Sequence, residues 1–149
     1  MKIKAIEIYN FDLTYVHGVY TMSGGRDITV LPSTLVRVVS DAGYEGWGEV
    51  CPLGATYLPQ HAEGARAALG LLAPALIGLD PTNHAAVYDT MDAVLMGHAY
   101  AKSPIDVACW DLTGKAWGAG VVDMLGGARQ EAFPLYFAVP LGAPEQMTR

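Results

Sequence analysis

The histidines are the side chains best suited to metal or acid–base chemistry, and their spacing argues against a shared site. The sequence has four of them, far apart: His17, His61, His84 and His98. No two stand four residues apart, as zinc ligands on one helix do. No GxSxG, Walker, GxGxxG or HExxH motif is present. A zinc site and the common nucleophile and phosphate-binding sites are therefore disfavoured.

Charged pairs near predicted helices have ordinary explanations beside functional ones. His61 and Glu63 could hold an anion, contact one another, or belong to a solvated helix face. Asp106 and Asp111 lie in an otherwise apolar helical segment and could be functional acids. Each also stands four residues from a lysine, so we expect the ion pairs Lys102–Asp106 and Asp111–Lys115, worth about 0.2–0.5 kcal/mol apiece.

Two segments concentrate Tyr, Thr, Gly and Ser, the residues that suit contact with a small polar ligand. They are Tyr15–Asp27 (YVHGVYTMSGGRD) and Cys51–Leu58 (CPLGATYL), and both are expected to be loops. A loop as long as the first is unusual in a small domain unless it is functional or disordered. The alternative is that both are plain surface loops.

The stretch Gly46-Trp47-Gly48 has two glycines but lacks the third glycine and the following helix of a dinucleotide-binding turn. Within a predicted strand, such glycines indicate that another backbone approaches closely.

The first third of the chain has β character. Residues rich in β-branched and aromatic types predict strands over Ile3–Leu13, Thr34–Ser40 and Tyr44–Val50. The last two are separated by the turn signal Asp41-Ala42-Gly43 and should form a hairpin. A final strand is expected over Phe133–Val139, followed by the start of a helix near Pro144.

Helices are predicted in the middle of the chain. The first opens at Pro59 and ends at Pro74, with Ala62, Ala65, Leu69 and Leu72 on one stripe. The second follows an N-cap at Thr82 or Asn83 and runs to about Met96. The third covers Ser103–Trp117, with a core-facing stripe: Ile105, Ala108, Cys109, Leu112 and Ala116. Strands followed by helices predict an α+β fold rather than βαβ winding.

Composition limits the class of protein. The chain has 149 residues, 52% of them hydrophobic, which predicts one folded domain. Its net charge is −6 and it has no basic run, so a nucleic-acid partner is not expected. Neither the N-terminus nor the apolar stretch 67–79, broken by Pro74, resembles a signal peptide or a membrane span. Cys51 and Cys109 are expected to be reduced, half-buried thiols in a cytoplasmic protein.

Three segments in order resemble the N-terminal capping domain of the mandelate racemase/muconate lactonizing enzyme family, in the enolase superfamily. They are TLVRVVSDAGYEGWGEVCP, LAPALIGLDP and AKSPIDVACWDLTGKAWGAGVVDMLGG. The third is the most specific, because it combines an Ile-Asp pair, a Trp-Asp pair and a closing Leu-Gly-Gly. The resemblance implies a three-stranded antiparallel meander packed on a helical bundle over residues 1–130. It also implies that residues 131–149 begin a TIM barrel that is otherwise missing from this chain.

The family's barrel carries the chemistry. The resemblance implies that barrel lysines or a histidine move an α-proton of a small carboxylate substrate, while barrel carboxylates bind Mg²⁺. No lysine follows Lys115 here. We therefore expect no catalytic residue, no metal ligand and no turnover in this chain alone, with Mg²⁺ belonging to the full-length family member.

The resemblance implies that the capping domain takes part in substrate recognition, because the family's two capping loops close over the substrate. They correspond to Tyr15–Asp27 and Cys51–Leu58, so the expected substrate-binding residues are Tyr57, Tyr20, Thr56 and His17. The segments EVCPLGATYLPQHA and HAYAKSPIDVACWDL resemble members acting on proline derivatives, the hydroxyproline dehydratases and proline-betaine epimerases.

Three interpretations of the whole chain remain open at this point. It could be the N-terminal portion of a lyase or isomerase that forms a homo-oligomer. It could be a stand-alone interaction domain that has lost its barrel, or a domain completed by a separate barrel chain. The unpaired apolar strand Phe133–Val139 favours the first.

Overall fold

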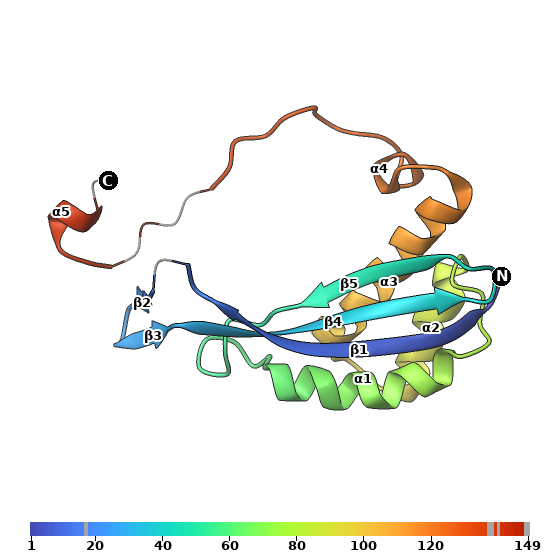
Figure 1. Ribbon diagram of the computed structural model, residues 1–149, viewed down its shortest axis with the longest axis horizontal. Coiled ribbons are helices and arrows are strands. Elements are labelled where there is room, and N and C mark those ends of the chain that lie inside the picture. Colours follow the sequence, from blue (N-terminus) through green and yellow to red (C-terminus); the bar gives the residue numbers. More distant parts are fainter. Residues whose placement is uncertain (17, 137–138, 140, 148–149) are drawn as a thin grey trace.

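Strands come first and helices follow in this computed structural model, which describes residues 1–16, 18–136, 139 and 141–147 (Figure 1). The elements are β1 (Ile3–Thr14), β2 (Tyr20–Met22), β3 (Arg26–Ile28), β4 (Val30–Ser40), β5 (Glu45–Val50), α1 (Ala62–Leu76), α2 (His84–Val94), α3 (Ala99–Trp117), α4 (Val121–Met124) and α5 (Pro144–Met147). The predicted α+β class is confirmed.

The main sheet is antiparallel with the strand order β1-β4-β5. Arg37 of β4 stands opposite Glu7 of β1 and Trp47 of β5. The predicted hairpin between β4 and β5 is therefore confirmed. β4 starts at Val30, earlier than predicted, and includes Pro32. A proline is tolerated there because β5 pairs only with residues 34–39, which leaves the start of β4 without a neighbour on that side.

The long segment Tyr15–Asp27 is not wholly a loop, which corrects the sequence prediction. Its second half belongs to a two-stranded sheet in which β2 pairs antiparallel with β3. Gly24 and Gly25 form the connection with φ values of 78° and 69°, a backbone region that glycine enters without steric cost. The hairpin signal was present in these two glycines, but each flanking strand is only three residues long.

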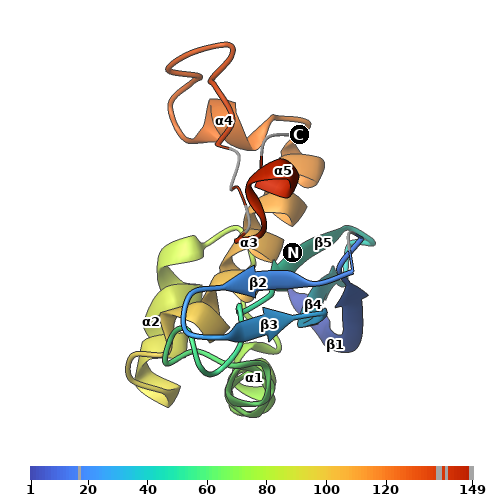
Figure 2. The same cartoon turned by 90° about the vertical axis from the view of Figure 1, so that its left-hand side faces the viewer.

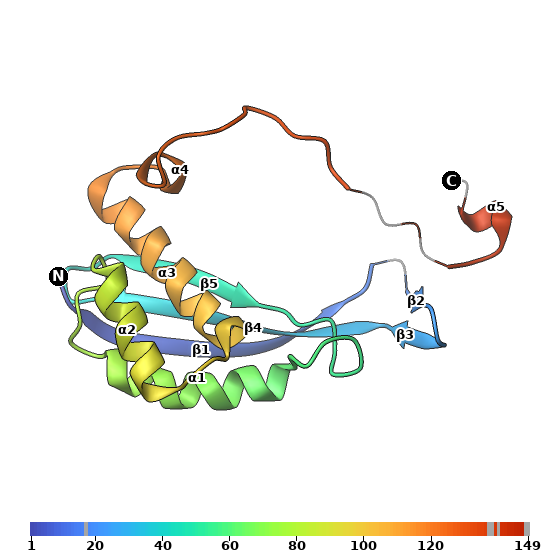
Figure 3. The ribbon, with the colours of Figure 1, turned by 180° about the vertical axis from the view of Figure 1, so that it is seen from behind.

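Helices α1, α2 and α3 lie on one side of the main sheet and leave its other face exposed (Figures 2 and 3). The buried core lies between these layers and draws apolar residues from both: Ile3, Val36, Val38, Leu69, Leu72, Leu76, Val87, Met91, Ile105, Ala108, Cys109 and Leu112. The predicted stripes of α1 and α3 are confirmed, except that Ala116 is only half-buried. Among the described residues, no helix combines the length and the apolar character needed to cross a membrane.

Strand β5 and helix α3 touch backbone to backbone. A Cβ atom on Gly46 would lie 1.9 Å from the carbonyl oxygen of Ala108, and one on Gly48 would lie 2.0 Å from that of Pro104. No side chain fits in either place, so the prediction of a close backbone approach at Gly46 and Gly48 is confirmed.

Two prolines do not end or begin helices where the sequence suggested. α1 starts at Ala62, not Pro59, and runs past Pro74 to Leu76, whose side chain is fully buried. Burial of Leu76 stabilises the last turn although Pro74 donates no hydrogen bond.

α3 starts at Ala99 rather than Ser103, because the carbonyl oxygen of His98 already accepts the first helical hydrogen bonds.

The ion pair predicted between Lys102 and Asp106 does not form. Lys102 is 4% exposed and its ammonium contacts Asp92 of α2 instead. Lys102 faces the neighbouring helix, so the partner across the helix interface is nearer than the partner along α3. The second predicted pair, Asp111–Lys115, is confirmed at 2.7 Å.

The described residues of the apolar segment 133–139 do not form the predicted strand. Residues 133–136 and 139 have no regular structure, and residues 137 and 138 lie outside the described part of the chain. An extended segment needs a neighbouring strand to form a ladder, and no described strand pairs with this one. Leu135 and Tyr136 are accordingly 86% and 91% exposed.

His84 joins α2 to α3. Asn83, one of the two predicted N-caps, accepts a hydrogen bond from the backbone N–H of Ala86, and His84 follows it. The His84 ring stacks on Trp110 at 3.8 Å between centroids, with its Nε2 3.4 Å from Thr113 Oγ1. Its Nδ1 is buried and has no hydrogen-bond partner among the described residues. Burial lowers the pKa of His84 and outweighs the charge of Asp106, which raises it.

Gly46→Ala should be strongly destabilising, because the added methyl group would meet the α3 backbone. We expect a loss of about 3 kcal/mol or more in the free energy of unfolding, measured by urea denaturation. The matched control is Gly70→Ala in α1, where a Cβ meets nothing within 4 Å. That variant should gain about 0.5–1 kcal/mol from helix propensity. Equal effects of the two substitutions would contradict the close contact.

Low pH should destabilise the packing of α2 against α3, because it favours protonation of His84. The folded chain holds the pKa of His84 below the 6.5 of the free side chain, so the unfolded chain binds the proton more readily. The contribution is therefore complete above pH 6.5 and is lost as pH falls below it. We expect the free energy of unfolding to drop as the pH falls below about 6.5, and to drop less in His84→Phe, which keeps the stacked ring. Identical slopes in both proteins would show that His84 is not responsible.

Candidate functional site

The two segments predicted to contact a ligand lie at the same end of the main sheet. The β2–β3 hairpin projects from the end farthest from the N-terminus, and Cys51–Leu58, which joins β5 to α1, lies at that end as well (Figures 1 and 3). They are called the capping segments below.

The hairpin segment is held by a few polar and aromatic contacts. The Thr21 hydroxyl donates to Asp27 at 2.7 Å across the two strands. The rings of Tyr15 and Tyr20 lie 5.6 Å apart, and Tyr20 is half-buried. His17, the fourth expected binding residue, lies outside the described part of the chain.

The segment Cys51–Leu58 presents its polar side chains to solvent. One internal turn is closed by the backbone N–H of Tyr57, which donates to the carbonyl oxygen of Gly54 at 3.2 Å. Tyr57 is 53% exposed, and Thr56 is exposed as well. Both side chains face solvent, and their role in substrate binding stays a prediction.

A polar network that the sequence analysis missed lies where Cys51–Leu58 leaves the sheet. Arg66 of α1 donates from Nε to Thr34 Oγ1 at 3.1 Å and from Nη2 to the Ser33 carbonyl oxygen at 3.2 Å. The Ser33 hydroxyl donates to Glu49 at 2.5 Å. The only signal in the sequence is that Arg66 stands on the flank of the apolar stripe of α1, between Ala62 and Leu69.

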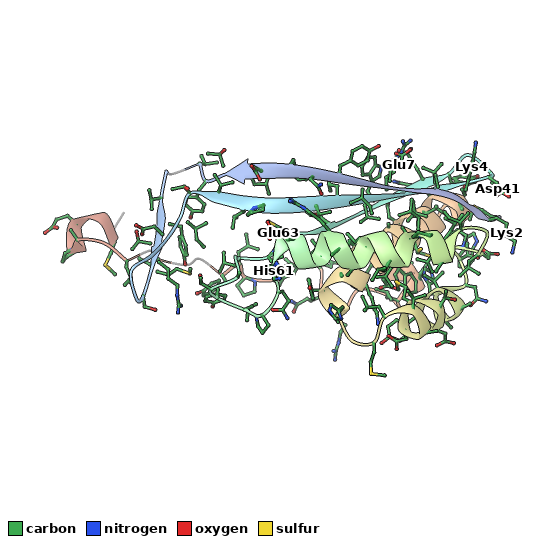
Figure 4. All side chains as sticks on the ribbon, turned by 90° about the horizontal axis from the view of Figure 1, so that it is seen from below. Lys2, Lys4, Glu7, Asp41, His61 and Glu63 are labelled. Carbon is green, nitrogen blue, oxygen red and sulfur yellow. The ribbon has the colours of Figure 1, made fainter. Side chains whose placement is uncertain are left out.

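The start of α1 carries the pair His61 and Glu63, close to the capping segments, whereas Lys2, Lys4 and Asp41 lie at the other end of the sheet (Figure 4). His61 Nδ1 accepts the Gly64 N–H at 3.1 Å and so caps the helix, with Glu63 at 3.3 Å from the same atom. The two residues contact one another, as one of the predicted alternatives has it. The pKa of Glu63 is lowered by its own backbone N–H and then by His61.

The exposed face of the sheet carries a second charged cluster whose members satisfy one another. Arg37 Nη1 contacts Glu7 at 3.0 Å, its Nε donates to Glu45 at 2.8 Å, and the Tyr9 hydroxyl donates to Glu7. These contacts lower the pKa of both carboxyls: the Tyr9 bond first for Glu7, and Arg37 first for Glu45. A carboxylate held ionised in this way is poorly suited to accept a proton from a weak carbon acid.

Two hollows accompany these elements. One of about 280 Å³ lies directly after the second capping segment and is lined by Pro59, Gln60, His98 and Tyr100. Gln60 Oε1 is buried there without a hydrogen-bond partner among the described residues. The other, of about 380 Å³, lies between α2 and α3 around the Lys102–Asp92 pair. The larger hollow contains none of the predicted binding residues.

Within the described ranges, no three His, Cys, Asp or Glu side chains come close enough to hold a metal ion. Together with the mutually paired carboxylates, this leaves a site that could contact and enclose a ligand.

Comparison with known proteins identifies relatives across the whole chain. The family profile described as "Mandelate racemase / muconate lactonizing enzyme, N-terminal domain" matches residues 21–126. A cis-3-hydroxy-L-proline dehydratase from Roseibium aggregatum is 48% identical over all of this chain and 41% of its own length. An N-succinyl-L-Arg/Lys racemase from Bacillus cereus is 32% identical over 99% of this chain and 39% of its own length.

Solved structures identify the same family. A mandelate racemase/muconate lactonizing enzyme from Roseovarius nubinhibens, complexed with magnesium, superposes with a TM-score of 0.93 and 42% identity, over 99% of this chain and 39% of that one. The chain thus spans about two fifths of the length of the relatives it matches, and the part it matches is their N-terminal domain. The TIM barrel of these relatives is absent from this chain, as the resemblance implied.

The two cysteines should report separately on the capping segment and on the core. The prediction that both thiols are half-buried is wrong: Cys51, the first residue of its segment, is exposed, whereas Cys109 is fully buried in α3. Burial, followed by the charge of Asp106, raises the pKa of Cys109 to about 12. We expect a disulfide reagent at about pH 8 to label one thiol per folded chain and two after denaturation. Cys51→Ser should abolish the fast reaction, and fast labelling of Cys109 would contradict the described core.

Proposed function

The chain belongs to the mandelate racemase/muconate lactonizing enzyme family, and from that premise we propose that it is the substrate-capping, specificity-determining portion of a magnesium-dependent lyase or isomerase. The reaction class is removal of an α-proton from a small carboxylate substrate. The barrel supplies the base and the metal, while this chain closes over the bound substrate.

The observation that carries the proposal is the 48% identity to the Roseibium dehydratase, because it extends over all 149 residues and so includes both capping segments. The names of other relatives, a racemase and a muconate cycloisomerase, agree on isomerase or lyase chemistry but differ in substrate. We therefore propose a proline derivative as the substrate class, and dehydration of a hydroxyproline as the reaction to test first.

The residues of this chain act by contact and by exclusion of water. Tyr57, Tyr20, Thr56 and His17 are the proposed substrate contacts. A tyrosine offers a flat apolar face to a ring and a hydroxyl group at one end. Closure of the capping segments keeps water from the charge that develops on the substrate carboxylate, where it would weaken stabilisation of that charge.

Magnesium is bound by the relative from Roseovarius nubinhibens, but the described residues of this chain do not fit a metal site. We assign no step of the reaction through a metal to them. We place the capping domain at residues 1–130 and the start of the barrel at residues 131–149, and expect the whole enzyme to be a homo-oligomer.

A fusion tests the proposal directly. Residues 1–149 replace the aligned N-terminal part of the Roseibium dehydratase, and turnover of cis-3-hydroxy-L-proline and related proline derivatives is measured. We expect turnover by the fusion and none by the 149-residue chain alone. Tyr57→Ala should lower kcat/KM by about tenfold or more, and Tyr57→Phe by less, because Phe keeps the ring.

The control is Tyr44→Ala, in the turn between β4 and β5 at the opposite end of the sheet. Its exposure, 41%, is close to the 53% of Tyr57. Both alanine variants should change the free energy of unfolding by less than about 1 kcal/mol. A folded fusion without activity on any proline derivative would contradict the substrate class, and equal kinetics for Tyr57→Ala and Tyr44→Ala would contradict the role of Tyr57.

A further inference from the structure

Arg66 occupies the second turn of α1 and reaches across to the middle strand of the sheet. Two different nitrogens of its guanidinium are used: Nε donates to Thr34 Oγ1 and Nη2 to the Ser33 carbonyl oxygen. Ser33 and Thr34 are both 0% exposed, so this is a polar contact inside the domain and not a surface pair. A charged donor to a buried acceptor is among the stronger hydrogen bonds in proteins.

The contact between Arg66 and Thr34 matters because of where Thr34 lies in the sheet. Thr34 stands opposite Val50, the last residue of β5. The chain leaves the sheet at Val50 and enters α1 at Ala62, so residues 51–61 are the connection that carries Thr56 and Tyr57. One end of this connection is held to Thr34 by the strand ladder, and the other is held to Thr34 by Arg66.

Each side of the connection has a further contact that Arg66 does not itself make. On the strand side, the Ser33 hydroxyl donates to Glu49, one residue before Val50. On the helix side, the Tyr100 side chain of α3 reaches α1, and a Cβ on Gly64 would lie 2.7 Å from its hydroxyl oxygen. Arg66 is the contact that joins these two sides, because it binds β4 from the helix itself.

We propose that Arg66 is a positioning residue for the capping segment Cys51–Leu58. It fixes the separation of the two ends of residues 51–61, and through them the presentation of Thr56 and Tyr57 to substrate. The expected effect of Arg66 on catalysis rests on the proposed function. Its expected effect on how residues 51–61 are held does not. Lysine cannot replace it, because a single ammonium group lacks the two-nitrogen fork that spans a side-chain oxygen and a backbone oxygen.

Loss of this contact should loosen the connection without unfolding the core. The ends of a flexible segment that are no longer held together regain conformational freedom, and the segment samples more arrangements. The α3 core, which Arg66 does not touch, should keep its protection against amide exchange.

Amide hydrogen exchange on the 149-residue chain is the first readout. In Arg66→Met, exchange of residues 51–60 should accelerate by about tenfold or more, while residues 105–113 of α3 stay as in the wild type. Arg66→Lys should resemble Arg66→Met, and Thr34→Val should show the same pattern at smaller amplitude. The matched control is Arg129→Met, since Arg129 is exposed beyond α4 and loses the same charge.

The second readout is the KM of the fusion enzyme, which a merely structural role would leave unchanged. Arg66→Met should raise KM by about tenfold with a smaller change in kcat, because substrate contacts are displaced while the barrel chemistry is not. Exchange that matches Arg129→Met, or that rises equally in residues 51–60 and in α3, would overturn the proposal. So would accelerated exchange with an unchanged KM.

The two proposals fail in different ways. A fusion that is inactive with Arg66 in place argues against the proposed function, whereas the exchange pattern still decides whether Arg66 holds the segment. If Arg66→Met does not fold, Arg66→Lys and Thr34→Val decide by the same measurements, because the first keeps the positive charge and the second keeps the Arg66 bond to the Ser33 carbonyl oxygen.

Discussion

The fold depends on how closely β5 can approach α3. Two glycines, Gly46 and Gly48, allow strand and helix backbones to touch, since any Cβ there would lie about 2 Å or less from a carbonyl oxygen of α3. The contact also protects the edge of the sheet. The Trp47 N–H donates to Asp111 at 2.9 Å, and Lys115 donates to the Glu45 carbonyl oxygen at 3.2 Å. Backbone groups that would otherwise face solvent at this edge are thus occupied.

Polar ties then attach the remaining helices to the sheet and to α3. Lys102 and His84 join α2 to α3, the first through Asp92 and the second by stacking on Trp110. Arg66 joins α1 to β4. Each tie places a charged or polar side chain in or beside the core with a partner from another element. Such contacts specify how the elements are aligned, whereas apolar burial alone tolerates sliding.

Predictions from the sequence were correct where a residue's structural role can be recognised from its neighbours in the chain. The apolar stripe of α3, the β4–β5 hairpin and the Gly46 and Gly48 approach all follow from spacing within one element. It failed where the partner comes from elsewhere in the chain. α3 was expected to start at Ser103, but the helix begins a turn earlier, from the carbonyl oxygen of His98. Lys102 was assigned a partner on its own helix and has one on α2.

The same distinction applies to the residues of the candidate site: some could be predicted from the sequence and others could not. Thr56 and Tyr57 were predicted as ligand contacts from the residue types of their segment, and the structure leaves them exposed, but their role stays a prediction. Arg66 was not identifiable, because nothing in α1 by itself shows that Thr34 lies opposite.

A capping segment has to meet two opposing requirements, and the arrangement around Thr34 meets both. It has to remain mobile enough to admit a substrate, so its side chains cannot be buried in the core. It also has to return to one geometry, because a displacement of about 1 Å in a positioning group is costly in catalysis. Anchoring only the two ends of residues 51–61 at one buried point restricts where the segment can go while leaving its middle free. In this proposal the buried Thr34 and the exposed Tyr57 act together, because fixing the two ends of residues 51–61 limits the positions that Tyr57 can reach.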